Sequence, residues 1–203
     1  MKQTTRIYLI RHGQTESNHN KIYQGRIDTE LNEAGKIQAA ATARHLAAQP
    51  LAAVYSSPLK RALATAEAVA EAHALPVRVA ADLQEMDFGL WEGLSFEQIQ
   101  SAFPQLAAQW LDTFYEVDLP EGESFTKLGQ RVGVPFRSIV SDHQGQEVAL
   151  IAHGGVNCVI ICDCLGLPYS QLRTLWQDNG ALSLLETDGC VWRLVLNNYL
   201  PNT

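Results

Sequence analysis

Two histidines stand in short glycine-containing segments whose residue types suit nucleophilic chemistry. Arg11-His12-Gly13 places a guanidinium beside an imidazole, and glycine allows a tight turn that lets a ligand approach the main chain closely. The second histidine, His153, is followed by Gly154 and Gly155. A neutral imidazole nitrogen is a nucleophile, and arginine forms paired hydrogen bonds with phosphate oxygens. These segments therefore favour an anion pocket that contains a nucleophile.

A phosphoryl group is one anion that such a pocket could take, and its chemistry indicates which other residues would then belong to the pocket. The transferred group spreads negative charge over three equatorial oxygens, so fixed cations and hydrogen-bond donors must surround it. Thr15 and Ser57 are secondary candidates, because they either support the pocket or only cap helices. The main candidates are the side chains of Arg11, Arg61, His153 and Asn18, and the main-chain amides of Gly154 and Gly155.

The departing alcohol and the attacking water both require a group that moves protons. Glu85 fits both roles, because its acid form would protonate the alkoxide and its carboxylate would then activate water. It must hold a proton near neutral pH, which a neighbouring Asp87 or partial burial would favour. Asp87 and Glu92 share the same glycine-containing loop and are the alternatives to it.

The candidate residues follow short apolar runs that are typical of buried strands. Residues 6–10, 51–55 and 147–152 form these runs, and they end at Arg11-His12, Ser56-Ser57 and His153. Ligands of parallel sheets bind beyond the carboxyl ends of the strands. We therefore expect these residues, although far apart in sequence, to share one site.

Segments with helical spacing alternate with these strands. The expected helices cover residues 31–49, 60–73, 124–143 and the segment after Gly154, with further helices within 96–114. A third short strand is expected at 77–79, and a hairpin at 182–185 and 191–196. This alternation predicts an α/β fold, namely a three-layer α/β/α sandwich with a mostly parallel central sheet and helices on both faces. We expect one domain over residues 1–203, with a helical cover segment at about 88–145.

The motif R-H-G-x-T-x-x-N at residues 11–18 resembles the signature of the histidine phosphatase superfamily, also called the phosphoglycerate mutase-like family. Segments 25–28, 31–35, 56–61, 85–93 and 152–155 recur in the family's order, with Gln14 and Asn32 as minor departures. The resemblance implies a metal-independent phosphatase that forms a phosphohistidine on His12, uses Glu85 as proton donor and acceptor, and needs no cofactor. The implied catalytic residues are His12, Glu85, His153, Arg11 and Arg61, and the implied substrate contacts come from Arg11, Asn18, Gly25, Arg61, His153 and Gly154.

The family contains both mutases and phosphatases, and the cover segment separates them. Mutases hold the second anionic group of phosphoglycerate with basic residues there, whereas this chain has no Lys or Arg between Arg78 and Lys127. The motif at 85–93 is similar to that of small phosphatases, including α-ribazole phosphatases. We therefore predict hydrolysis of a small phosphorylated metabolite, with α-ribazole phosphate and phosphoserine among the candidates. Mutase-type phosphoryl transfer and a catalytically silent phosphate-binding module on the same fold are the alternatives.

The cover segment is rich in aromatic side chains. We expect most of them to pack in the core, but one or two that faced the pocket would favour a substrate with an apolar or aromatic group. The aromatic residues are Phe88, Trp91, Phe96, Phe103, Trp110, Phe114 and Tyr115.

Composition limits the partners that can be expected. The chain has 203 residues, 46% of them hydrophobic, and its 15 Lys and Arg against 22 Asp and Glu give a net charge of −7. Because no basic run interrupts this acidic balance, nucleic acid is not an expected partner. Since no apolar run approaches the roughly 18 residues that span a bilayer, we expect a cytoplasmic protein without a membrane span. A homodimer is compatible with the sequence.

The remaining cysteines and histidines receive structural interpretations. Cys158, Cys162 and Cys164 interleave with aliphatic residues in a spacing unusual for zinc, so these three and Cys190 are expected to be buried reduced thiols. A metal-dependent hydrolase built on His12 and His153 is the competing hypothesis, but no H-x-H or D-x-D cluster accompanies them. The surface is the expected place of His19, His45, His73 and His143.

Overall fold

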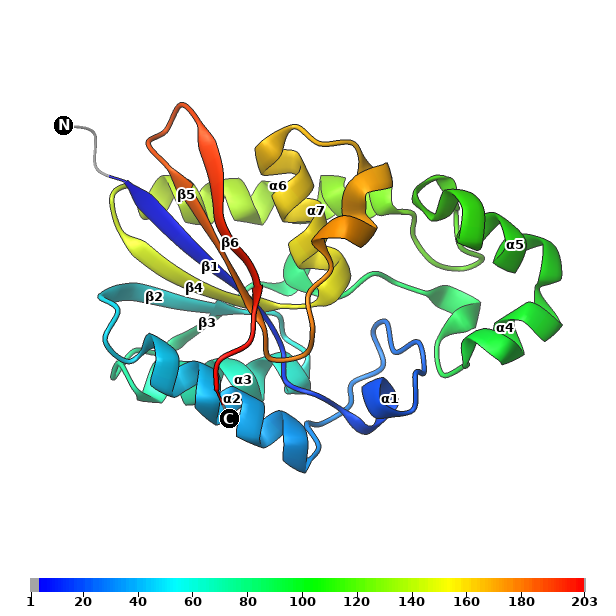
Figure 1. Cartoon of the computed structure of the whole chain (residues 1–203), viewed down its shortest axis with the longest axis horizontal. Helices are drawn as coiled ribbons and strands as arrows, with labels where there is room; N and C mark the ends of the chain where they lie inside the picture. Colours follow the sequence, from blue (N-terminus) through cyan, green and yellow to red (C-terminus); the bar gives the residue numbers. More distant parts are fainter. Residues whose placement is uncertain (1–3, 203) are drawn as a thin grey trace.

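The computed structural model describes residues 4–202 and shows one six-stranded sheet with helices on both faces (Figure 1). The strand order is β3-β2-β4-β1-β5-β6. The first four strands of this order run parallel, β5 runs antiparallel to β1, and β6 runs antiparallel to β5. The predicted α/β fold with a mostly parallel sheet is confirmed. The strands are β1 (Thr5–Arg11), β2 (Leu51–Ser56), β3 (Val77–Val79), β4 (Glu147–Ala152), β5 (Leu182–Thr187) and β6 (Trp192–Tyr199).

Each central strand is apolar along its length because helices cover both faces of the sheet. In β1, Ile7 and Leu9 face the core formed with α6 (Phe125–Asp142) and α7 (Gly154–Leu165). The alternate residues, Tyr8 and Ile10, face the core formed with α2 (Glu33–Leu46) and α3 (Lys60–Glu71). This alternation fixes the register of β1, so the residues that follow its last position are fixed as well.

The segment between β3 and β4 supplies the cover. Helices α4 (Phe96–Ala102) and α5 (Pro104–Thr113) extend away from the sheet, whereas α6 lies on the sheet beside α7 (Figure 1). Ser95 and Gln98 form a capping box at the start of α4, and Pro104 occupies the first turn of α5. Short 3-10 segments join these helices: η1 (Ala81–Leu83), η2 (Gly89–Trp91), η3 (Phe114–Glu116) and, after α7, η4 (Tyr169–Leu175).

Three expectations differ from the structure. A four-residue helix, α1 (Glu16–His19), lies between β1 and α2, where no helix was expected, because Thr15 and Asn18 satisfy its first amides through a capping box. His143 is buried rather than exposed, since its ring nitrogens contact the Tyr55 hydroxyl at 3.1 Å and Gln146 Oε1 at 2.7 Å. Cys190 is exposed and Cys164 is only half-buried, whereas Cys158 and Cys162 are buried as expected.

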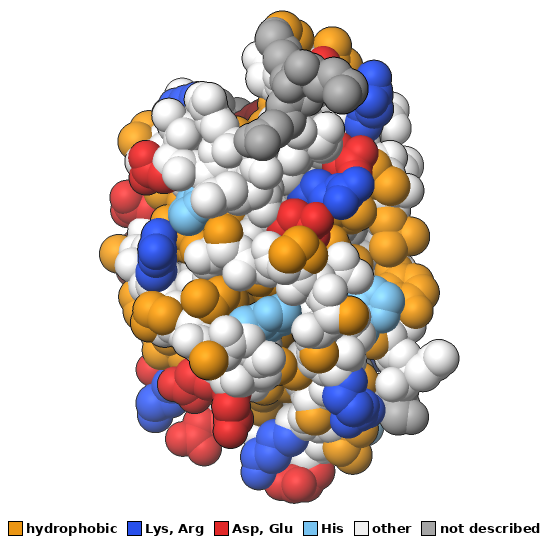
Figure 2. Space-filling model, turned by 90° about the vertical axis from the view of Figure 1, so that its left-hand side faces the viewer, with side chains coloured by type: hydrophobic (Ala, Val, Ile, Leu, Met, Phe, Trp, Pro, Cys, Tyr) orange, Lys and Arg blue, Asp and Glu red, His pale blue; other side chains and the backbone are white. Residues whose placement is uncertain are grey.

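The left-hand side of the molecule in Figure 1, seen face-on in Figure 2, displays acidic and basic side chains next to each other rather than a continuous basic patch. Within residues 4–202, no helix has the length and apolar character needed to cross a membrane. In the same range, no three His, Cys, Asp or Glu side chains are grouped closely enough to hold a metal ion.

The start of α2 packs directly against the loop that follows β1. A Cβ added to Gly13 would lie 2.9 Å from the Gly35 Cα, and one added to Gly35 would lie 2.8 Å from the main-chain nitrogen of Gln14. Asn32 caps α2 by accepting from the Gly35 amide at 2.9 Å and donates to Gln14 Oε1 at 3.0 Å. The two departures from the family motif, Gln14 and Asn32, thus contact each other and fasten this loop to α2.

Gly35→Ala should lower the free energy of unfolding by about 1–3 kcal/mol, because the new Cβ meets main-chain atoms that cannot move aside. Gly133→Ala in α6 is the matched control, since its Cβ meets only the flexible end of Arg137. That change should raise stability by about 0.5–1 kcal/mol through helix propensity. Urea unfolding of both variants measures the difference, and equal effects of one sign would contradict the close approach.

Candidate active site

Three neighbouring parallel strands deliver the candidate residues to one edge of the sheet. His12 follows β1, Ser57 follows β2 and His153 follows β4, and β4 lies between the other two. The rings of His12 and His153 lie 5.1 Å apart between centroids, and both side chains are buried. The structure therefore brings together the two histidines that the sequence singled out.

The hydrogen bonds of His12 define its tautomer. Nδ1 lies 2.7 Å from the Gly13 carbonyl oxygen, which can only accept, so Nδ1 carries the proton. Nε2 accepts a hydrogen bond from Arg61 Nε at 3.2 Å. Burial, followed by the charges of Arg61 and Arg11, lowers the pKa of His12 well below its ordinary value. At neutral pH the ring is uncharged and Nε2 presents a lone pair.

Arg61 lies in the first turn of α3 and is 1% exposed. Its terminal nitrogens donate to the carbonyl oxygens of Gly25 and Ile27, each at 2.7 Å, and each nitrogen keeps a second proton. The same loop caps the helix, because Asp28 accepts from the Lys60 amide at 2.8 Å. Burial lowers the pKa of Arg61 to about 10, so the guanidinium remains charged at neutral pH.

Two further nitrogen atoms next to His12 are buried without a hydrogen-bond partner among the described residues, namely Arg11 Nε and His153 Nδ1. Arg11 is held from one side by the Gln177 carbonyl at 2.6 Å and stacks on Trp176, with its Cζ 5.0 Å from the ring centroid. His153 Nε2 lies 2.7 Å from the Ser57 hydroxyl, so Ser57 orients this ring. A buried polar atom without a partner is costly. A phosphate oxygen would satisfy Arg11 Nε, and it would satisfy His153 Nδ1 in the tautomer in which Ser57 donates to Nε2.

Asn18, Gly25 and Gly154, which were also expected to contact the substrate, differ in what they can offer to a ligand. Asn18 Oδ1 accepts from Thr15 and from Asn179 at 3.1 Å, so only its amide nitrogen remains to donate to a ligand. Gly25 has a φ of +51° and no room for a Cβ, and its carbonyl holds Arg61. Gly154 begins α7, with Trp176 in contact with its backbone.

Glu85 lies beside the start of α7 and is partly buried. Its carboxylate accepts from the Met86 amide at 2.9 Å and from the Gly155 amide at 3.2 Å. The Gly155 amide, which we expected in the phosphate cradle, therefore holds the proposed acid instead. The Asp87 carboxylate forms an ion pair with Arg26 at 3.0 Å, and the Glu92 carboxylate accepts from the Arg26 amide.

Two cavities meet at Glu85. The first has a volume of about 220 Å³, and its lining includes Arg11, His12, Asn18, Gly25 and Arg61. The second has a volume of about 330 Å³ and is mostly apolar, and it shares Tyr23, Glu85, Phe88 and Trp176 with the first. More cover-segment aromatic residues than expected face this second cavity, namely Phe88, Phe96, Trp110 and Phe114.

Residues 176–179, which the sequence did not single out, complete the site. Asn179 donates to the His12 carbonyl at 3.3 Å, and the buried Gln177 donates to the Leu9 carbonyl at 3.1 Å. No motif marks this segment. Its position follows from the antiparallel pairing of β5 with β1, which places the residues before β5 beside the end of β1.

Comparison with known families agrees with this geometry. The family model described as histidine phosphatase superfamily (branch 1) matches residues 7–199. The chain belongs to the histidine phosphatase superfamily. Relatives named as phosphatases match most of its length, and this histidine phosphatase is accordingly a hydrolase of phosphate esters that acts on a small phosphorylated metabolite.

Its relatives differ in the substrates that their names give. Phosphoserine phosphatase 1 of Hydrogenobacter thermophilus is 31% identical over 183 residues, which cover 90% of this chain and 87% of that protein. Among solved structures, the α-ribazole phosphatase of Shigella flexneri has a TM-score of 0.88 at 27% identity and covers 98% of both chains. A mycobacterial glucosyl-3-phosphoglycerate phosphatase complexed with VO3 has a TM-score of 0.86 at 32% identity, covering 95% of this chain and 98% of that one.

The low pKa values of His12 and His153 predict a loss of stability in acid. Both are lowered well below 6.5 in the folded state, so below that pH the unfolded chain binds more protons than the folded chain. As the pH falls below 6.5, the free energy of unfolding should decrease by up to about 1.4 kcal/mol per pH unit for each ring. Urea unfolding between pH 7 and 5 should show a shallower decline for His12→Gln/His153→Gln than for the wild type, and parallel declines would contradict the assignment.

Proposed function

We propose that this enzyme hydrolyses a small phosphomonoester, whose alcohol carries an apolar or aromatic group, through a phosphohistidine on His12. The observation that carries the proposal is the Nε2 lone pair of His12, held next to the buried guanidinium of Arg61. Two buried nitrogens without a partner among the described residues, Arg11 Nε and His153 Nδ1, support phosphate binding, because Arg11 lines the pocket and the His153 ring lies against that of His12. α-Ribazole phosphate is the first substrate to test.

In the first step, the Nε proton of Arg61 turns from His12 Nε2 to a phosphoryl oxygen of the bound substrate, Nε2 attacks phosphorus with the lone pair thus released, and the bond to the alcohol oxygen breaks. The charge of the three equatorial oxygens is stabilised by Arg11 and Arg61, with His153 and Asn18 as further donors. Proton loss from Nδ1 is not required, because the Gly13 carbonyl keeps that proton in place while the ring becomes a phosphorylated imidazolium. No group other than these side chains is needed to balance the charge.

Glu85 moves the proton in both steps. Its acid form gives a proton to the departing alkoxide, and the resulting carboxylate takes one from the water that attacks the phosphohistidine. The position of Glu85 supports this role, because it lies where the cationic cavity meets the apolar cavity. The phosphorus–oxygen bond of a bound substrate would cross this boundary.

The second cavity supports an apolar or aromatic alcohol. Arg173 is the one cation among the described residues that line this cavity. Its guanidinium already donates to the carbonyls of Trp110 and Leu111, and its Cζ lies 4.2 Å from the centroid of the Phe114 ring. A second carboxylate or phosphate would find little compensation there. This favours a nucleoside-like phosphate such as α-ribazole phosphate over phosphoglycerate, and it disfavours mutase-type transfer.

His12→Ala should lower kcat for p-nitrophenyl phosphate at least about 10³-fold, because the covalent route is lost. Wild-type activity should persist in EDTA, since the two arginines supply the positive charge. A steady-state assay with and without EDTA measures both effects. A silent phosphate-binding module predicts no turnover by the wild type, and a metal-dependent hydrolase predicts inhibition by EDTA.

Phe96→Ala should raise KM for α-ribazole phosphate about 5- to 20-fold and leave KM for phosphoserine nearly unchanged, because Phe96 lines the apolar cavity. Phe103→Ala is the matched control, since Phe103 lies in the same cover segment and does not line that cavity. Equal effects of the two variants, or of Phe96→Ala on the two substrates, would contradict the assignment of this cavity to the alcohol.

A further inference from the structure

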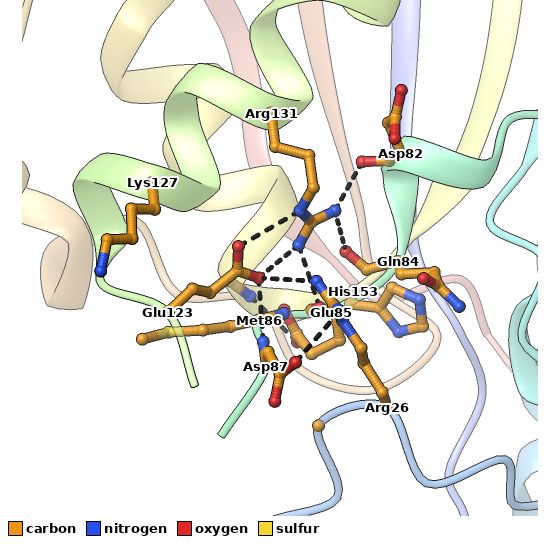
Figure 3. Close-up of polar contacts among 12 residues, drawn as sticks. Arg26, Asp82, Gln84, Glu85, Met86, Asp87, Glu123, Lys127, Arg131 and His153 are labelled. Carbon is orange, nitrogen blue, oxygen red and sulfur yellow. Dashed lines mark hydrogen bonds and ion pairs between the residues drawn. The ribbon is translucent and has the colours of Figure 1, made fainter. Parts of the chain in front are cut away.

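Four charged side chains form a connected network next to the loop that carries Glu85 (Figure 3). Arg26 comes from the loop before α2, Asp87 from the loop after Glu85, Glu123 from the turn before α6, and Arg131 from α6 itself. Neither Glu123 nor Arg131 belongs to the phosphate pocket. Their contacts are nevertheless directed at the main chain around Glu85.

Arg131 binds three main-chain carbonyls of that loop. One terminal nitrogen donates to the carbonyls of Asp82 at 2.6 Å and Gln84 at 3.0 Å, and the other donates to the Glu85 carbonyl at 3.1 Å. The planar guanidinium is suited to such divergent contacts, whereas a lysine ammonium offers a single point of attachment. Arg131 thus fixes the main chain on both sides of the Glu85 Cα.

Glu123 fixes the main chain two residues after Glu85, at Asp87. Glu123 is 8% exposed, and its carboxylate accepts from the Asp87 amide at 2.9 Å. It also accepts from Nε of Arg131 at 3.2 Å and from a terminal nitrogen of the same guanidinium. One ion pair therefore holds the carbonyls on either side of the Glu85 Cα and, further along the chain, the Asp87 amide.

Arg26 connects this ion pair to the phosphate pocket. Its guanidinium lies 3.0 Å from Asp87 Oδ2 and 3.5 Å from Glu123 Oε1. The preceding residue, Gly25, supplies the carbonyl that holds Arg61. The loop that carries the acid and the loop that fixes the cation beside His12 are thus joined through one network.

We propose that Arg131 and Glu123 are positioning residues that set the distance of Glu85 from the alcohol oxygen. This inference rests on the proposed role of Glu85 as proton donor. A carboxylic acid protonates a leaving group only within hydrogen-bond reach, and a displacement of about 1 Å costs on the order of 10²-fold in rate. Neither residue lines the phosphate pocket. We therefore expect their substitution to lower the rate only for substrates whose leaving group must be protonated.

The test compares two aromatic phosphomonoesters with different leaving groups. 2-Phenylethyl phosphate releases an alkoxide that needs a proton, whereas p-nitrophenyl phosphate releases a stable phenolate. The quantity compared is kcat/KM, because it covers only the steps up to leaving-group release. Arg131→Lys keeps the charge that compensates Glu123, and Glu123→Gln is the second variant should the first not fold. Arg137→Lys is the control, because Arg137 is an exposed arginine of the same helix.

Arg131→Lys and Glu123→Gln should lower kcat/KM for 2-phenylethyl phosphate about 10- to 100-fold, and for p-nitrophenyl phosphate less than about threefold. In a Glu85→Gln background, neither change should lower the 2-phenylethyl phosphate value further. Equal losses on both substrates, no loss, or full additivity with Glu85→Gln would overturn the inference. If Glu85→Gln alone lowers kcat/KM equally for the two substrates, the proposed role of Glu85 as proton donor is wrong. The positioning role of Arg131 and Glu123 is then wrong as well.

Discussion

The contact between Arg61 and His12 is the constraint on which the rest of the site depends. A buried guanidinium that donates to Nε2 requires a lone pair on that nitrogen, so it holds the ring in the neutral tautomer. The same cation lies where phosphoryl charge would develop. The proposed nucleophile and its electrostatic support therefore form one unit, fixed by the carbonyls of Gly25 and Ile27 and by the capping of α3 through Asp28.

The fold makes this unit rigid by building it at the ends of packed strands. Apolar alternation fixes the register of β1, and the close approach of Gly13 and Gly35 fastens the following loop to α2. Glu85 belongs to a separate loop, which lies between the sheet and the cover segment. The ion pair of Arg131 and Glu123 and the bridge from Arg26 align this loop with the first unit.

Local patterns in the sequence were sufficient for much of this architecture. The apolar runs that end at His12, Ser57 and His153 predicted buried strands, because such runs are visible in neighbouring residues. Their alternation with helices predicted a parallel sheet, in which the ends of these strands share one edge. The Gly155–Glu85 bond, the contacts of Asn179 with His12, and the network around Arg131 could not be predicted. They join segments brought together only by tertiary packing, and no short motif records them. His143 was misplaced for the same reason, since its partners lie on β2 and in the turn before β4.

The most direct test of the central claim is the chemical state of His12 during turnover. The enzyme would be mixed with p-nitrophenyl phosphate, quenched in alkali within milliseconds, digested and analysed by mass spectrometry. The phosphoryl group should be found on Nε2 of His12 and should be lost on acidification. A phosphoryl group on Nδ1, on His153 or on any other residue would contradict the account, as would turnover in which the enzyme is never phosphorylated.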